Sequence, residues 1–243
     1  MSLKRSKVGS SRIDSSVENE VQAALTWLKR HSTKRTLEGM ARYGLPSENA
    51  LGVSVSDLHL LAKKLGRNHL LAVALWKTGC YEARMLACFV DEPERVTTAQ
   101  MDRWCRDFDN WGICDTACFH LFDRTSFAWD KARQWSSSPS EFIKRAGFAL
   151  MASLVAHDKS ARDPQFLALL PLIEEGARDE RNFVKKAVNW ALRTIGKHSL
   201  NLNKAAVTTA KRLAASKEAS PRWVGKDALR ELASPKVRAR LTR

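Results

Sequence analysis

A short sequence pattern recurs along this chain with a nearly constant spacing. The segments Phe142–Ala146 (Phe-Ile-Lys-Arg-Ala) and Phe183–Ala187 (Phe-Val-Lys-Lys-Ala) start 41 residues apart, and Trp223–Lys226 (Trp-Val-Gly-Lys) follows 40 residues later. An earlier segment, Tyr81–Arg84, has the same order of an aromatic residue and, three positions on, a basic one. A period of this length is typical of folds in which similar units stack on one another.

The apolar residues are spaced as they are in helices. Val21, Ala24, Leu25 and Leu28 recur at helical intervals, whereas sustained alternation of period two is scarce and the chain has only 7 prolines. The sequence therefore predicts an all-α protein. A period near 40 residues is typical of two-helix HEAT-like units, which form a solenoid with one helix of each unit on its concave face. The alternative is an ordinary bundle of unrelated amphipathic helices.

The charge is strongly unbalanced, with 41 Lys and Arg residues against 26 Asp and Glu residues, a net charge of +15. Such an excess favours a polyanionic partner, either nucleic acid or an acidic membrane surface. No apolar run approaches the roughly 20 residues of a transmembrane helix. We therefore expect a protein without a membrane span and with a basic face suited to DNA.

The N-terminal segment differs from the rest in composition. Residues 1–16 are Ser-rich, basic and poor in large apolar side chains, so we expect a disordered tail, with the repeat domain over residues 17–243. The N-terminus lacks the apolar core of a signal peptide. The cysteines number five and form no Cys-x-x-Cys pair, which argues against a disulfide framework and a zinc site. We expect a cytoplasmic, nucleoid-associated monomer of bacterial type, with no metal and no cofactor.

One predicted helix carries cations and a tryptophan on a single face. At 100° per residue, a helix starting near Asn182 places four residues in one narrow sector: Lys186, Trp190, Arg193 and Lys197. The apolar residues of the same helix fall on the opposite side. Trp190 is therefore either a core residue that faces a neighbouring helix or an aromatic contact for sugar and base within a phosphate-binding stripe.

The corresponding inner positions of the other units are also basic, namely Arg84, Arg145 and Lys226. In the unit between Arg84 and Arg145 this position falls on Asp115, four residues after Trp111 and so on the same helix face. A carboxylate there weakens phosphate binding. It is either a helix cap, a salt-bridge partner of a nearby Arg, or a group that stabilises a cationic sugar and holds the attacking water.

Several of these residues, in this order and spacing, resemble the AlkD family of bacterial DNA alkylation-repair glycosylases. The matching elements are Trp111-x-x-x-Asp115, Arg145, Trp190-x-x-Arg193, the segment Met40–Tyr43 and the segment Lys185–Arg193. The likeness extends from about Val17 to Leu232. It implies a curved HEAT-like solenoid that holds duplex DNA on a concave, basic face and hydrolyses the N-glycosidic bond of cationic N3- and N7-alkylated purines.

The resemblance also implies roles for single residues. Asp115 would be the catalytic carboxylate, Trp111 and Trp190 would contact the deoxyribose of the lesion, and Arg145 and Arg193 would hold flanking phosphates, with Tyr43 assisting. With Arg84, Lys186 and Lys197 from the basic positions above, these residues form the predicted site. The sequence shows no candidate Schiff-base lysine in an apolar setting, so we do not expect lyase activity. Two alternatives remain open: a non-catalytic protein that binds damaged or branched DNA, and a protein-binding solenoid with an acidic partner.

Overall fold

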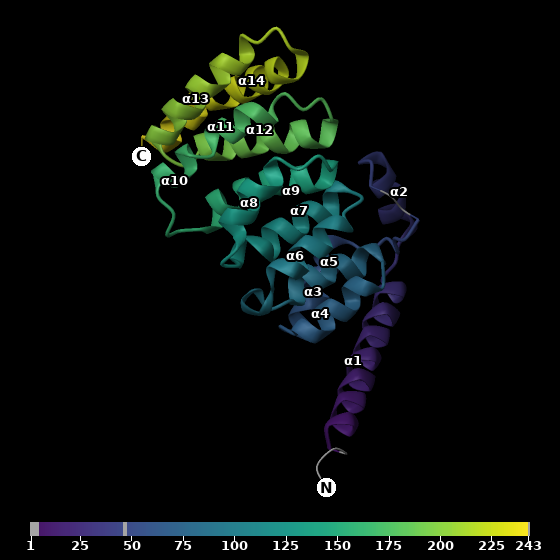
Figure 1. Cartoon of the computed structure of the whole chain (residues 1–243). Helices are drawn as coiled ribbons and strands as arrows, with labels where there is room; N and C mark the ends of the chain where they lie inside the picture. The colour runs from purple at the N-terminus through teal and green to yellow at the C-terminus, as the bar shows by residue number, and fades with distance from the viewer. Residues whose placement is uncertain (1–4, 46–47, 243) are drawn as a thin grey trace. The chain divides into compact units, whose positions relative to one another are not determined.

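The computed structural model describes residues 5–45 and 48–242, and within these residues the chain is helical and has no strand (Figure 1). The predicted all-α class is therefore confirmed. The chain divides into two compact units, Met1–Val96 and Thr97–Arg243. No described helix is both long enough and apolar enough to cross a lipid bilayer.

Unit 1 contains the first helices of the chain: α1 (Arg5–Arg30), α2 (Lys34–Arg42), α3 (Val55–Leu65), α4 (His69–Lys77), α5 (Tyr81–Val90) and the 3-10 turn η1 (Pro93–Arg95). Helix α1 begins inside the segment expected to be a tail, and residues 1–4 of that segment lie outside the described residues. The disorder of the tail and the boundary at residue 16 stay predictions.

Unit 2 contains the remaining helices: α6 (Thr98–Arg106), α7 (Trp111–His120), η2 (Phe122–Arg124), α8 (Ala128–Ser136), α9 (Glu141–His157), α10 (Asp163–Leu167), α11 (Leu170–Gly176), α12 (Asn182–Gly196), α13 (Leu200–Ala214), α14 (Ala219–Leu232) and α15 (Pro235–Leu241). Helix α8 packs against α9 and α13 against α14, while α9 also packs against α12. Successive helix pairs are thus stacked through α7, α9, α12 and α14.

The helix starts follow from local sequence. At many of them a short polar side chain accepts a hydrogen bond from the backbone N–H three residues later, as an N-cap does. In unit 2 these caps are Thr97, Asn110 and Ser199, which precede α6, α7 and α13, and Ser234, which precedes α15. The caps fix where each helix begins, and the apolar spacing then fixes which face is buried.

Glycines let the helices of two pairs, α8–α9 and α13–α14, approach closely. Gly147 of α9 lies against the backbone of Ser136, at the end of α8, so that an added Cβ would overlap it. Gly225 of α14 lies in the same way against Ala214, at the end of α13. The aromatic residues of the sequence repeat also meet, since the rings of Phe142 and Phe183 are 5.4 Å apart between centroids. The helical repeat is therefore present in the structure as well as in the sequence.

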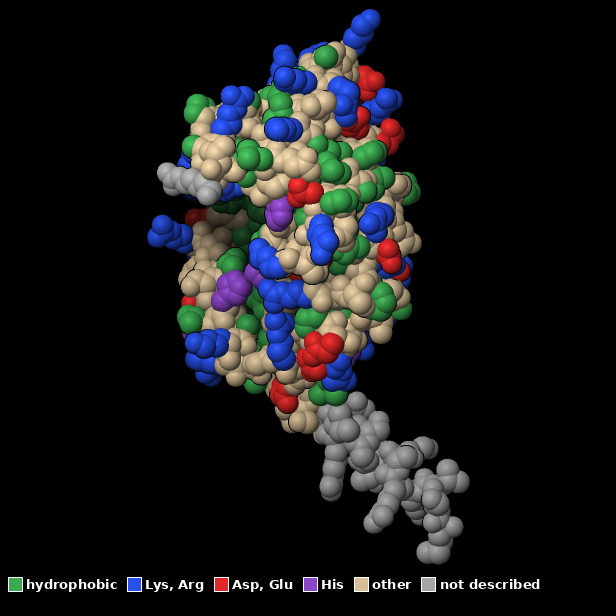
Figure 2. Space-filling view, turned by 90° about the vertical axis from the view of Figure 1, so that its left-hand side faces the viewer, with side chains coloured by type: hydrophobic (Ala, Val, Ile, Leu, Met, Phe, Trp, Pro, Cys, Tyr) green, Lys and Arg blue, Asp and Glu red, His purple; other side chains and the backbone are tan. Residues whose placement is uncertain are grey.

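Much of the excess positive charge lies at the surface. Figure 2 shows one face, on which basic side chains in blue form a run beside histidine side chains in purple. Of the repeat positions, Lys186 and Lys226 are exposed, whereas only 6% of Arg145 is exposed. A concave basic face stays a prediction.

Candidate nucleic-acid interface

Most of the predicted site lies on three helices of unit 2 that pack in the order α7, α9, α12. Trp111 and Asp115 are on α7 and Arg145 is on α9, whereas α12 carries Lys186, Trp190, Arg193 and its C-cap Lys197. Residues that lie up to 86 positions apart in the sequence are thereby gathered in one part of the unit.

Asp115 and Arg145 form a two-pronged ion pair. Nε of Arg145 donates to Oδ1 of Asp115 at 2.8 Å, and Nη2 donates to Oδ2 at 2.7 Å. The remaining nitrogen, Nη1, donates to the backbone carbonyl of Phe183 at 2.6 Å, near the start of α12. Arg145 therefore joins α7, α9 and α12, and this planar fork fixes the direction of the carboxylate.

The structure decides between the two structural alternatives for Asp115. Capping is wrong, because the N-cap of α7 is Asn110, whose side chain accepts from the backbone N–H of Ile113. The salt bridge to an arginine is present. It does not bury the carboxylate entirely, since 21% of the Asp115 side chain is exposed against 7% for Arg145. The Asp115 side chain thus keeps some accessible surface.

Burial and charge act in opposite directions on this pair. Burial raises the pKa of the Asp115 carboxyl above its ordinary value, although Arg145 pulls it down. Burial also tends to lower the pKa of Arg145, but Asp115 outweighs it and the pKa of the guanidinium is raised. Arg145 therefore stays charged, and Asp115 needs a higher pH than an exposed carboxyl does to ionise.

Trp190 belongs to an aromatic cluster that also includes a residue of α7. Its ring stacks on that of Phe119, with centroids 6.4 Å apart and planes 26° apart. Phe119 in turn meets the edge of His157 at 4.3 Å, and Nδ1 of His157 pairs with the buried carboxylate of Asp123. Trp190 is half-buried, so it is neither a fully buried core residue nor a free surface group.

The cations at the C-terminal half of α12 are paired with acidic residues of α14. Arg193 contacts Glu231 through Nε and Asp227 through Nη1, the latter at 3.3 Å, and Nζ of Lys197 lies 2.8 Å from Glu231. Burial tends to raise the pKa of Glu231, but Lys197 and Arg193 outweigh it, so its pKa is lowered and it is ionised at neutral pH. Part of the positive charge predicted for this face is therefore neutralised.

Two of the predicted site residues, Tyr43 and Arg84, lie in unit 1. Tyr43 follows α2 and is 72% exposed. Arg84 of α5 is half-buried, with its guanidinium 5.3 Å from the ring centroid of Trp76. Trp111, in unit 2, is the first residue of α7 and is half-buried.

The sequence analysis missed the partners of the site residues. Phe119 follows Asp115 by four positions, so the helical spacing that joined Trp111 to Asp115 could have found it. Asp227 and Glu231 follow Arg193 by 34 and 38 positions, and only a repeat period gives any signal at such a distance.

The cysteines near the site are part of the core. The thiols of Cys114 and Cys118 are buried and lie 3.6 Å from the carbonyl oxygens of Phe142 and Ala146 in α9. Within the described residues, no group of three His, Cys, Asp or Glu side chains is arranged to hold a metal ion.

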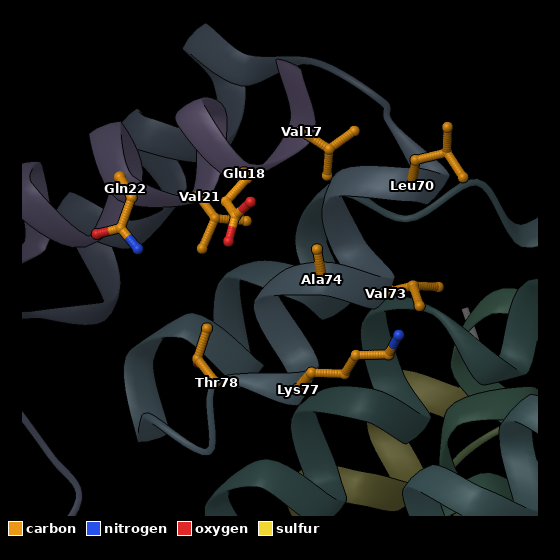
Figure 3. Close-up of a pocket in the computed structure, with 9 residues that line it drawn as sticks. All are labelled: Val17, Glu18, Val21, Gln22, Leu70, Val73, Ala74, Lys77 and Thr78. Carbon is orange, nitrogen blue, oxygen red and sulfur yellow. The ribbon is translucent and has the colours of Figure 1, made fainter. Parts of the chain in front are cut away.

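Unit 1 has a groove of about 480 Å³ between α1 and α4 (Figure 3). Its walls are largely apolar, with Val21, Leu70 and Val73 facing it and Glu18 and Lys77 as its charged members. It contains none of the predicted site residues, and the sequence analysis did not foresee it.

Comparison with known proteins gives consistent family matches. A sequence model of the family described as DNA alkylation repair enzyme matches residues 24–232. The uncharacterized protein Lin0241 of Listeria innocua is 24% identical over 190 residues, which cover 76% of this chain and 83% of that protein. The uncharacterized protein Lmo0209 of Listeria monocytogenes is 23% identical over the same shares.

A solved structure resembles most of the chain. It is described as a new family of proteins related to the HEAT-like repeat DNA glycosylases with affinity for branched DNA structures. The TM-score is 0.76 at 22% identity, with 90% of this chain and 95% of that chain covered. The likeness confirms the predicted HEAT-like helical fold.

Proposed function

The chain belongs to the DNA alkylation repair enzyme family, and from this premise we propose that it is a monofunctional DNA glycosylase acting on cationic N3- and N7-alkylated purines in duplex DNA. The observation that supports this most is the Asp115 carboxylate. It is oriented by Arg145, keeps 21% of its side chain exposed and shares a helix face with Trp111. An oriented, partly accessible carboxylate on a basic surface suits a reaction that develops positive charge on a sugar.

The chemistry needs few groups. The bond between C1′ and the purine nitrogen breaks, and its electron pair neutralises the positive charge that alkylation placed on the base. The base thus leaves without a general acid. Asp115 stabilises the cationic sugar that remains and accepts a proton from the water whose oxygen bonds to C1′. Trp111 and Trp190 would line the sugar, where their π faces favour a cation.

In this proposal Arg145 positions the carboxylate. Its three described hydrogen bonds go to Asp115 and to the Phe183 carbonyl, and only 6% of the residue is exposed. The phosphate contact that the family resemblance implies for Arg145 would come in addition. Lys186, Arg193 and Lys197 hold backbone phosphates from α12, and Tyr43 and Arg84 contact DNA from unit 1.

A second function has its own support. The solved structure that resembles this chain is described as having affinity for branched DNA. A carboxylate already paired on both oxygens also fits a purely structural role. On this alternative the protein binds distorted or branched DNA without cutting a bond.

One experiment separates the two functions. A duplex with a single N7-methylguanine is incubated with excess protein, and the free base and the abasic site are measured over time. A glycosylase releases the base faster than the slow spontaneous loss in buffer and leaves the abasic strand uncut. The same protein is titrated with a four-way junction and with undamaged duplex. Release at the spontaneous rate, together with tighter binding to the junction, would replace the first function by the second.

A further inference from the structure

Helix α14 carries an exposed tryptophan that the proposed function does not use. Trp223 is 40% exposed, although an indole is among the largest apolar groups a protein can bury. Lys226 and Arg230 follow it by three and seven positions and are exposed on the same side of the helix. We refer to Trp223, Lys226 and Arg230 as the α14 ridge.

The α14 ridge borders the cationic face of α12. Nζ of Lys185, in α12, lies 5.2 Å from the ring centroid of Trp223. One turn further along α14, Asp227 accepts from Asn189 at 2.7 Å, contacts Arg193 of α12 and pairs with Arg230 of the ridge. Because Asp227 touches charged groups of both helices, the two cationic surfaces are neighbours within unit 2.

The ridge repeats the residue pattern of α12 one unit on. Phe183-x-x-Lys186 on α12 corresponds to Trp223-x-x-Lys226 on α14, 40 positions later. The surroundings of the two rings differ, however, because Phe183 lies against the ring of Phe142 whereas Trp223 has a lysine ammonium over its ring. An aromatic ring among cations is the arrangement by which proteins hold nucleotides through stacking and phosphate contacts together.

Stacking limits what the ridge can bind. The faces of bases within a duplex are already covered by their neighbours, so an aromatic side chain gains a base face only where a nucleotide is unpaired. We propose that the α14 ridge binds an unpaired nucleotide next to the duplex held by α12, as occurs at a flap, a nick or a branch. The base stacks on Trp223, and Lys185, Lys226 and Arg230 contact the adjoining phosphates. This inference rests on the DNA binding proposed above, but not on base excision.

The test measures affinity for two DNAs that differ only in an unpaired segment. Fluorescein-labelled undamaged duplex is prepared with blunt ends and with a short single-stranded thymidine flap, and anisotropy gives the Kd of each. Stacking of one base on an aromatic ring predicts that the wild-type protein favours the flapped duplex about tenfold. Trp223→Ala should remove most of this preference and leave blunt-duplex binding unchanged, while Trp223→Phe should keep most of it.

Two further variants serve as a control and as a second test of the ridge. Leu200→Ala, which alters a side chain of α13 that is 45% exposed, is the matched control and should keep the wild-type preference. Lys226→Glu alters an exposed position without truncating an apolar group, and should weaken flap binding more than blunt-duplex binding even if Trp223→Ala unfolds. Melting curves verify that each variant is folded.

The outcomes are distinct. Equal loss on both DNAs in Trp223→Ala would mean that Trp223 packs on duplex sugars, and an unchanged flap preference would mean that it is a plain surface residue. Either result overturns the proposal while the proposed function stands. Absence of DNA binding by the wild-type protein overturns both.

Discussion

Asp115 shows how a partner changes what a carboxylate can do. Both of its oxygens accept hydrogen bonds from Arg145, so its charge is balanced before DNA arrives. The pair fixes the direction of the carboxylate, but it also lowers the net charge that a sugar cation would meet. The loss of Asp115 should therefore affect stability as well as rate, because Arg145 would be left buried with incomplete partners.

Replacing Asp115 by Asn tests its catalytic role. Removing one charge from a buried pair costs about 3 kcal/mol of unfolding free energy, and removing a well-placed electrostatic group costs on the order of a hundredfold in rate. We expect Asp115→Asn to melt at a lower temperature and to release N7-methylguanine at least tenfold more slowly per folded molecule. Single-turnover excision and a melting curve on the same samples measure both quantities.

The matched control is another ion pair of unit 2, in which the lysine is buried and the carboxylate is partly exposed. Nζ of Lys131 donates to Asp102 at 2.6 Å, and Asp102→Asn should lower the melting temperature without changing the rate per folded molecule. Equal rates for wild type and Asp115→Asn would reduce the carboxylate to a structural role.

The pH dependence of the wild-type rate is a separate test of the same carboxylate. Since burial raises the pKa of Asp115, wild-type activity should fall as the pH drops through a value above the pKa of an ordinary Asp carboxyl.

At the scale of the element, the close approach of α8 and α9 depends on the glycine at position 147. A Cβ on Gly147 would overlap the backbone of Ser136, and backbone cannot move aside as the end of a flexible side chain can. Gly39 of α2, by contrast, has nothing within 4 Å of the place where its Cβ would lie. An added methyl group would therefore meet a steric clash at Gly147 and open space at Gly39.

Alanine at each glycine should change stability in opposite directions. We expect Gly147→Ala to lower the free energy of unfolding by about 3 kcal/mol through overpacking. Gly39→Ala should raise it by up to ~1 kcal/mol, because alanine favours an open helical position. Urea unfolding followed by circular dichroism measures both. A neutral Gly147→Ala would mean that the α8–α9 contact is loose.

The elements were also where sequence reasoning succeeded. The aromatic and basic positions that recur about every 40 residues gave the helical repeat, because each unit has to place the same kinds of residue on the same faces. The contacts between units were not predictable in this way. Arg145 meets Asp115 across 30 positions and Arg193 meets Asp227 across 34, and no local rule distinguishes these partners from other charged residues. The sequence thus named candidate site residues, which stay predictions, but it gave little sign of the contacts around them.

At the scale of the whole molecule, the distribution of charge matters more than its sum. The chain carries a net charge of +15, yet Glu231 holds Arg193 and Lys197 on the face proposed to bind phosphate. Phosphate contacts made by Arg193 and Lys197 therefore compete with internal ion pairs. Glu231 would reduce affinity for undamaged DNA, where long residence serves no purpose.

Glu231→Gln should release that competition. We expect tighter binding to undamaged duplex and a log–log salt slope steeper by about 0.9, which corresponds to one more phosphate neutralised. Glu174→Gln is the control, since Glu174 pairs with Arg212 of α13 and not with the cations of α12. Affinities measured across a salt series for both variants decide the matter. Identical slopes for Glu231→Gln and wild type would show that Arg193 and Lys197 do not contact phosphate.

The three-way contact of Arg145 has a consequence for how such a site can be inherited or transplanted. Its guanidinium is fixed by Asp115 on one side and by the Phe183 carbonyl on the other, so the arrangement needs α7, α9 and α12 at their present separation. Duplicating or exchanging a single repeat would therefore never copy the carboxylate in its working orientation. A graft into a designed helical array would have to move the whole segment from α7 to α12 as one block.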